Sequence, residues 1–336
     1  MSAKRSLISR RHALAGIVFA PTLVSRPAEA KEKTIAALFA GSIKDGGFME
    51  AGYQGFQTAS NQAGYQATFM DGIKPEKDLL VQALRQLARA APDLVIAHGG
   101  QNNAAVQTVA EEFPQTLFAV TQGNVIGSNL SSYEVLQEQS AFLAGAMAAW
   151  STKTGIVGHM SGIRVIPGLK GRAAYANGVS YADPKVKLLT NFSGNQDDNA
   201  LSYKVASAMI NQGADIIFTM LNSGRVGAID ACREKGIKQI GNVGDWVATV
   251  PDVFIASAIA NSGLAMSNAI FDVAASRFKS GVIQRIGLEQ AEAVRLSMAS
   301  SIPQVIQTKV ASLTTDILTG RLNVSTDWIG EEFPNP

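Results

Sequence analysis

Polar and aromatic side chains stand close behind the short apolar runs of this 336-residue sequence, often beside glycine. Asn and Gln can each donate and accept hydrogen bonds, Asp accepts them, and aromatic rings offer flat faces for stacking. Together these side chains could hold a small molecule with a planar face and a mixed polar edge. The candidate ligand-binding residues are Asp45, Phe48, His98, Gln101, Gln122, Gln196, Asn222, Asp245 and Trp246.

The apolar runs before these residues contain four to eight residues, as expected for strands that are buried on both faces. Such runs occupy 34–40, 65–70, 93–98 and 115–121, then 156–160, 186–192, 215–220 and 239–243. Amphipathic stretches between them predict helices over 48–63, 75–91, 102–113, 137–152, 170–181, 199–212 and 226–235. This alternation predicts parallel sheets with right-handed crossovers, and its two series predict two doubly wound α/β lobes.

The two lobes are expected to be joined by a hinge. Lobe 1 would contain 31–134 plus about 255–285, and lobe 2 would contain 135–254 plus about 286–336. The chain would cross between them near 133–137, near 242–251 and at a later strand. Ligands of doubly wound sheets bind at the carboxyl ends of the strands, so the two sets of loops would face each other across a cleft. Phe48 and Trp246 could grip a planar ligand there from opposite lobes.

Residues 1–30 have the features of an export signal. Four basic residues near the start precede an apolar stretch over 13–24, and Ala28-Glu29-Ala30 matches a cleavage site. The apolar stretch is shorter than the roughly 20 residues that span a bilayer. Residues 9–14 (SRRHAL) are similar to a twin-arginine pattern, and an ordinary signal is the alternative. We expect a soluble periplasmic chain that begins near Lys31 and carries no lipid, since no cysteine follows the signal.

Charge argues against a nucleic-acid partner. The chain carries 29 basic and 27 acidic residues, a formal net charge of +2. Residues 1–30 hold five of the basic residues and one acidic residue, which leaves 24 basic and 26 acidic residues, or −2, in the remainder. A chain with this balance lacks the positive charge that attracts a phosphate backbone.

The sequence lacks the common signatures of catalysis and metal binding. His98 and His159 have no partner at the i, i+4 spacing of zinc hydrolases, and neither a dinucleotide-binding glycine motif, a phosphate loop nor a nucleophile elbow is present. Cys232 is the only cysteine, so it forms no internal disulfide and is expected to be buried in a helix. We predict no catalytic residues, no metal and no cofactor.

Five segments, taken in order, resemble the basic membrane protein family, the purine-nucleoside-receptor-like solute-binding proteins of ABC importers. The most specific are the segment LQEQSAFLAGAMAA and the segment TGIVGHMSG, which is followed by Pro167. The segments lie at 41–56, 136–149, 154–162, 212–218 and 235–241.

The resemblance implies a type I periplasmic-binding-protein fold that binds a small molecule, often a purine nucleoside, and delivers it to an inner-membrane ABC permease. Asp45 and Phe48 match positions of the family's first ligand loop, whereas Met49, Gln122 and Gln196 depart from the family's residues. The preferred ligand is therefore a nucleobase or a similar small heterocycle. A hydroxylated compound or an organic cation is the alternative.

The leading hypothesis is an exported solute-binding protein that closes on its ligand by a hinge movement and leaves the ligand unchanged. One alternative is a periplasmic sensory protein that presents its liganded state to a membrane receptor. Another is an exported hydrolase or lyase that uses Asp45 or Asp245 as a base.

Overall fold

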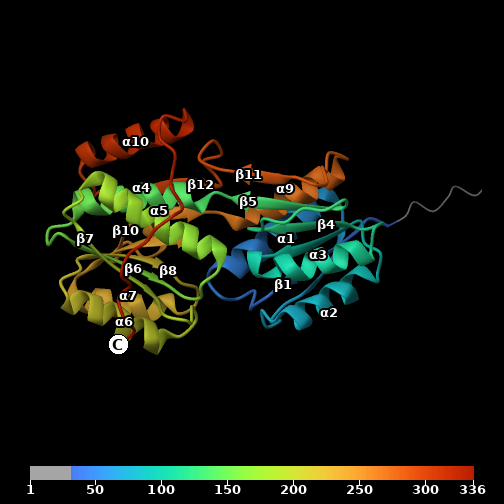
Figure 1. Ribbon diagram of the computed structural model, residues 1–336, viewed down its shortest axis with the longest axis horizontal. Coiled ribbons are helices and arrows are strands. Elements are labelled where there is room, and N and C mark those ends of the chain that lie inside the picture. The colour runs from blue at the N-terminus through green and yellow to red at the C-terminus, as the bar shows by residue number, and fades with distance from the viewer. Residues whose placement is uncertain (1–31) are drawn as a thin grey trace, which may run out of the picture. The chain divides into compact units, whose positions relative to one another are not determined.

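The computed structural model describes residues 32–336, so the predicted export signal lies outside the described part. Residues 33–336 form one compact unit that contains two six-stranded sheets (Figure 1). The strands of the first sheet are β1 (Thr34–Phe39), β2 (Gln66–Met70), β3 (Leu94–His98), β4 (Leu117–Thr121), β5 (Leu130–Val135) and β11 (Ile283–Ile286). The strands of the second sheet are β6 (Ile156–Ser161), β7 (Lys187–Phe192), β8 (Ile216–Met220), β9 (Lys238–Val243), β10 (Phe254–Ala260) and β12 (Val294–Met298).

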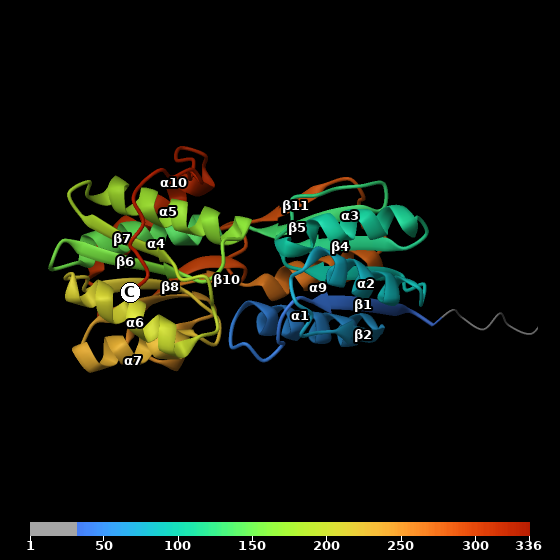
Figure 2. The same ribbon diagram turned by 60° about the horizontal axis from the view of Figure 1, so that its bottom comes forward.

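Helices cover both faces of each sheet. The first sheet is flanked by α1 (Phe48–Ala63), α2 (Lys77–Ala88), the short 3-10 helix η1 (Gly100–Asn102), α3 (Asn103–Glu112) and α9 (Ser262–Ala274). The second is flanked by α4 (Gln137–Ser151), α5 (Ile166–Ala182), α6 (Asn199–Asn211), α7 (Arg225–Lys235), α8 (Trp246–Thr249) and α10 (Gln304–Leu318). Figures 1 and 2 show α4 and α5 on one side of the second sheet and α6 and α7 on the other.

The two sheets share one strand order. The first runs β2-β1-β3-β4-β5-β11 and the second runs β7-β6-β8-β9-β10-β12. All neighbours pair in parallel except β12, which runs antiparallel to β10. This order places a switch in winding direction between β1 and β3, and again between β6 and β8, where loops diverge and a ligand can enter. The predicted α/β architecture of two doubly wound lobes is confirmed.

Three connections join the sheets. The chain passes to the second sheet after β5, within the predicted crossover at 133–137, and it returns only at Asn261, after β10. The predicted crossover at 242–251 and the predicted return to lobe 1 at about 255 are wrong, because β10 pairs with β9 in the second sheet. The third connection lies between β11 and β12.

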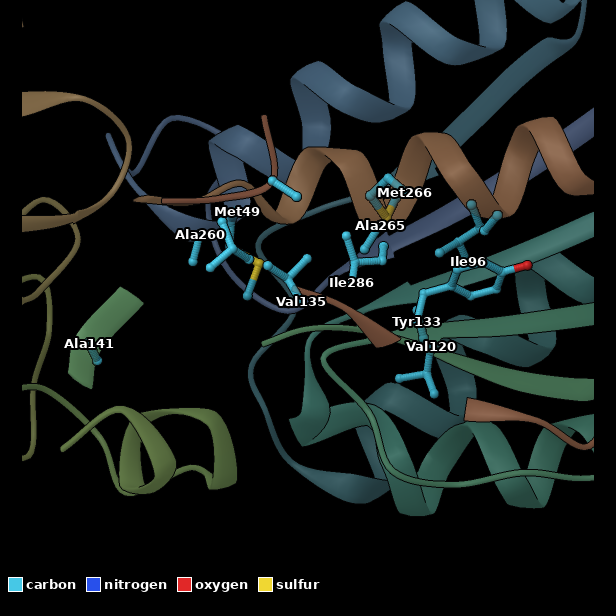
Figure 3. Packing of buried hydrophobic residues seen from close by; sticks show 14 of the residues in the cluster. Met49, Ile96, Val120, Tyr133, Val135, Ala141, Ala260, Ala265, Met266 and Ile286 are labelled. Carbon is cyan, nitrogen blue, oxygen red and sulfur yellow. The ribbon is translucent and has the colours of Figure 1, made fainter. Parts of the chain in front are cut away.

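Buried apolar side chains form a continuous cluster where the connections meet. Figure 3 shows Met49, Val135, Ala260 and Ile286 close together at this place. The cluster extends into both sheets, so the junction of the lobes is packed like a protein interior. Within residues 32–336, no helix is both long and apolar enough to cross a membrane.

Glycine allows α4 and α5 to pack backbone against backbone. A Cβ atom at Gly145 in α4 would lie 2.1 Å from the Tyr175 carbonyl oxygen, and one at Gly178 in α5 would lie 2.1 Å from the Phe142 carbonyl oxygen. Neither position has room for a larger residue. This contact matters for the site, because α4 follows a crossover and α5 begins at the edge of the cleft described below.

We expect Gly145→Ala to lower the free energy of unfolding by about 1–3 kcal/mol, because the added methyl group overlaps a backbone carbonyl that cannot move away. Urea unfolding followed by circular dichroism measures the change. Gly244→Ala is the matched control, since no atom lies within 4 Å of its Cβ position. Equal stability of the two variants would contradict this explanation of the packing.

Candidate functional site

A cleft of about 600 Å³ lies between the carboxyl ends of the two sheets. Its walls come from the ends of the strands and the loops after β1, β2 and β3 in the first sheet and after β6, β7 and β8 in the second, together with the last residues of β9. This volume is typical of sites for small molecules. Five of the nine predicted ligand residues line it: Asp45, Phe48, Gln101, Gln196 and Asn222.

Asp45 fixes the start of α1. Its carboxylate accepts hydrogen bonds from the backbone N–H groups of Gly47 (2.8 Å), Met49 (3.1 Å) and Glu50 (3.1 Å). These are free donors of the first helical turn, so the carboxylate caps the helix. Burial raises the pKa of Asp45, against the opposing effect of these three hydrogen bonds. The side chain is thus mainly committed to the loop, with one oxygen lone pair left for a ligand.

Phe48 is held by a histidine beneath it. The two rings stack with centroids 4.2 Å apart, and His98 Nε2 lies 3.0 Å from the Phe48 carbonyl oxygen. His98 Nδ1 lies 2.7 Å from Thr121 Oγ1. A neutral ring protonated at Nε2 satisfies both contacts, with the threonine hydroxyl as donor to Nδ1. His98 is fully buried and does not line the cleft; it supports the aromatic residue that does.

Asn222 connects the two lobes across the cleft. Its side-chain oxygen accepts a hydrogen bond of 3.4 Å from the backbone N–H of Phe48. Gly47 provides the space for this approach, since a Cβ atom there would lie 2.5 Å from the same oxygen. The loop after β8 therefore touches the first turn of α1 in this arrangement of the lobes.

Gln122 is buried and braces a crossover instead of lining the cleft. Its amide nitrogen donates to the Val135 carbonyl (3.1 Å), and its amide oxygen accepts from the Val135 N–H (2.5 Å). This pairing ties the end of β4 to the end of β5, directly before the chain leaves the first sheet. Gln122 was predicted to contact the ligand, but it does not line the cleft, and both polar groups of its side chain bond to the backbone of Val135.

Trp246 lies behind the cleft wall. Its indole N–H donates to the Asn242 carbonyl (3.0 Å), and its ring lies 4.4 Å from the guanidinium carbon of Arg225. Arg225 is fully buried and donates to Asn242 Oδ1 (2.8 Å), and burial lowers its pKa to about 9. Trp246 thus covers a buried cation that orients Asn242, which does line the cleft. The predicted clamp between Phe48 and Trp246 does not form.

Asp245 lines a different cavity, of about 410 Å³, beside the crossover at Asn261. Ser297 Oγ donates to Asp245 Oδ2 (2.9 Å), and Arg295 lies 3.8 Å from the same oxygen. The strand-end pattern placed the loop 244–246 at the cleft, but the cleft is bordered by Asn242 and Val243 of β9 itself. The helix α8 begins directly at Trp246, and Asp245 lines the second cavity.

Several cleft residues were missed. Gln137 follows the crossover at the start of α4, and Asn242 lies inside β9, so neither belongs to the loops that strand ends indicate. Lys44 and Lys74 bring positive charge to a wall that also contains the carboxylates of Asp45 and Asp197. The apolar part of the wall includes Ile73, Ile163, Val165, Pro167 and Met220. Within the described residues no group of His, Cys, Asp and Glu side chains is arranged to hold a metal ion.

Acid is expected to act on the fold through His98. Burial lowers its pKa to about 4, whereas the unfolded chain has a pKa near 6.5. Since the unfolded state binds the proton more readily, stability is complete above about pH 6.5 and falls as the pH drops toward 4, by about 3 kcal/mol. An NMR titration of the His98 ring should show the neutral form down to about pH 4. A ring that titrates near pH 6.5 would disprove this.

Comparisons with known proteins agree with the fold. A purine-binding protein of Brucella abortus is 24% identical over 194 residues, which are 58% of this chain and 55% of that protein. The transcriptional activator protein Med of Bacillus subtilis is 23% identical over 77% of this chain and 78% of its own length. The crystal structure of an ABC transporter solute-binding protein from Aeropyrum pernix superimposes with a TM-score of 0.78 and 21% identity, covering 88% of this chain and 94% of that one.

The family model of PnrA-like ABC transporter substrate-binding proteins matches residues 32–325. This range contains both sheets and every residue of the cleft. The resemblance that the sequence motifs indicated is therefore confirmed, and the chain belongs to the PnrA-like family of ABC transporter substrate-binding proteins.

Proposed function

We propose that this protein captures a small polar heterocycle, a nucleobase or a nucleoside-like molecule, in the cleft and delivers it to an inner-membrane ABC permease. The observation that carries the proposal is the composition of the cleft wall. One aromatic ring, that of Phe48, stands among amide side chains that both donate and accept hydrogen bonds: Gln101, Gln137, Asn195, Gln196, Asn222 and Asn242. A planar ring with a mixed polar edge matches such a wall.

The polar edge of a nucleobase suits amides better than it suits single charges. Each Asn or Gln can satisfy a ring nitrogen and an adjacent exocyclic group. Lys44 and Lys74 stand at the cleft as well, and they would favour electron-rich acceptors on the ligand. The Brucella relative named as a purine-binding protein supports this ligand class.

Capture would proceed by closure of the lobes. A ligand can drive such a movement only through contacts that are better in the closed arrangement. In the arrangement described here, the hydrogen bond from Phe48 N–H to Asn222 already joins the two lobes. A second contribution is electrostatic, since the charge of Asp45 in one lobe interacts favourably with Arg225 in the other. A ligand bound to both sets of loops would add to these terms.

We propose that the ligand is bound without chemical change, so the protein would act as neither a hydrolase nor a lyase. The carboxylate of Asp45 already accepts three backbone hydrogen bonds, which opposes its use as a base. Asp245 lies outside the cleft wall. A sensory role is the second candidate, favoured by the relative named as a transcriptional activator. Deletion of an adjacent permease separates the two functions, since loss of ligand uptake would indicate transport and unchanged uptake would favour sensing.

Native mass spectrometry of freshly purified protein, followed by thermal shifts with nucleobases and nucleosides, tests the ligand class. A purine at about 100 times its dissociation constant should stabilise the protein by roughly 2.7 kcal/mol. Phe48→Ala should weaken that binding by about 5- to 150-fold, since a stacked ring contributes about 1–3 kcal/mol. Asp245→Asn, outside the cleft, is the matched control and should bind normally. Binding of a sugar or an organic cation instead of any purine would refute the proposed ligand, and a chemically altered ligand would refute binding alone.

We further propose that residues 1–30 direct export to the periplasm and are then removed. Mass spectrometry of the periplasmic protein should find a chain that begins near Lys31 without an attached lipid. Cys232, the only cysteine, is buried in α7, which supports the absence of a thioether-linked lipid. If the twin-arginine pattern at 9–14 is used, replacing Arg10 and Arg11 by lysine should retain the precursor in the cytoplasm; unchanged export would indicate an ordinary signal.

A further inference from the structure

The last residues of the chain lie along the second lobe and end beside the cleft. After α10 the chain turns back, and Figure 1 shows it passing over α5 toward the C-terminus near α6. We call residues 323–336 the C-terminal strap. The match to the PnrA-like family ends at residue 325, so most of the strap lies outside the residues that the family match covers.

The strap is fastened first to α5. The side-chain nitrogen of Asn177 donates to two strap carbonyls, those of Ser325 (3.1 Å) and Asp327 (3.0 Å). Two bonds from one amide fix the path of an extended segment that has no helix or strand of its own.

The second attachment is a buried cation. Arg172 is 7% exposed, and its guanidinium carbon lies 4.2 Å from the ring centre of Trp328 in the strap and 5.2 Å from that of Phe192 in β7. It also donates to Glu332 at 2.9 Å. A buried guanidinium needs such partners, and the strap supplies two of the three.

The same glutamate reaches a loop of the cleft. Glu332 pairs with Arg164 as well as with Arg172. Arg164 stands between Ile163 and Val165, both of which line the cleft. The two arginines together lower the pKa of Glu332, with burial opposing them. One strap carboxylate therefore ties the loop after β6 to the body of α5.

The third attachment extends the edge of the second sheet. The backbone N–H of Phe333 donates to the Thr190 carbonyl in β7 (2.7 Å), and Asn191 donates to the Phe333 carbonyl (2.8 Å). The amide of Asn335 donates to the Ser193 carbonyl (3.4 Å). Ser193 directly precedes the segment 194–197, which lines the cleft.

We infer that the C-terminal strap is a positioning element of the ligand site, which holds the loops after β6 and β7 in the arrangement that binds the ligand. The inference rests on the cleft's being the binding site. The strap's attachments Arg164 and Ser193 adjoin lining residues, while Glu332, Trp328 and Asn335 do not line the cleft themselves. The strap thus acts on binding through two loops and not by touching the ligand.

Hydrogen exchange of the ligand-free protein tests this without knowledge of the ligand. In a chain that ends at Val324, amides of 161–167 and 192–197 should exchange about 10-fold faster or more, while those of β3 and β8 keep their protection. Glu332→Gln should accelerate mainly 161–167. Glu331→Gln, at the adjacent exposed position, is the matched control and should match the full chain. Unchanged exchange in both loops would overturn the inference, and so would faster exchange spread evenly over the second sheet.

A binding measurement completes the test, with adenosine as the probe and isothermal titration as the readout. Truncation at Val324 and Glu332→Gln should each weaken adenosine binding by about 10-fold, comparable to losing one charge-assisted contact. Equal affinity of the truncated and full chains would overturn the inference even if the exchange changed. If the full chain does not bind adenosine, that result contradicts the proposed ligand class and not the role of the strap. The hydrogen-exchange result then decides whether the strap positions the two loops.

Discussion

Parallel pairing of strands is the constraint on which the rest of this molecule depends. A parallel neighbour requires a crossover connection, in most cases through a helix, so the loops that follow the parallel strands of one sheet emerge at the same end of that sheet. Two sheets with the same order, joined by three short connections, bring two such edges face to face. The cleft is therefore a consequence of the topology, and its contents are decided by the loops.

Buried polar side chains hold those loops in place. Asp45 caps α1, His98 supports Phe48, Arg225 orients Asn242, and Arg172 anchors the strap beside β7. Each is buried; Asp45 and His98 bond to the backbone, Arg225 to backbone carbonyls and Asn242, and Arg172 to Glu332 and two aromatic rings. Because an unpaired polar group in such a place is costly, each of these side chains favours one loop conformation. The contacts that position these loops thus come from the protein itself.

Membership of the family and the nature of the ligand depend on different parts of the chain. The family match covers residues 32–325, and the fold is shared with a solute-binding protein and with a transcriptional activator of known structure. The ligand contacts that we propose come instead from the residues that line the cleft. Met49 lies in the first turn of α1, where its apolar side chain joins the core and also borders the cleft.

The sequence by itself determined the lobes, most of the strands and the helix Phe48–Ala63, because their apolar periodicity is a local property. It also identified the cleft loops after β1, β3, β6, β7 and β8, since these follow strand ends, but it missed the loop 72–75 after β2 and wrongly included the loops after β4 and β9. It did not show that β10 remains in the second sheet, because strand pairing joins residues that are distant in sequence. Only the tertiary structure decided which loop side chains face the cleft. The side chain of Gln122 bonds to Val135, the ring of Trp246 lies over Arg225, and the carboxylate of Asp245 accepts from Ser297. Each partner is at least 13 residues away in the sequence, so the local pattern did not indicate it.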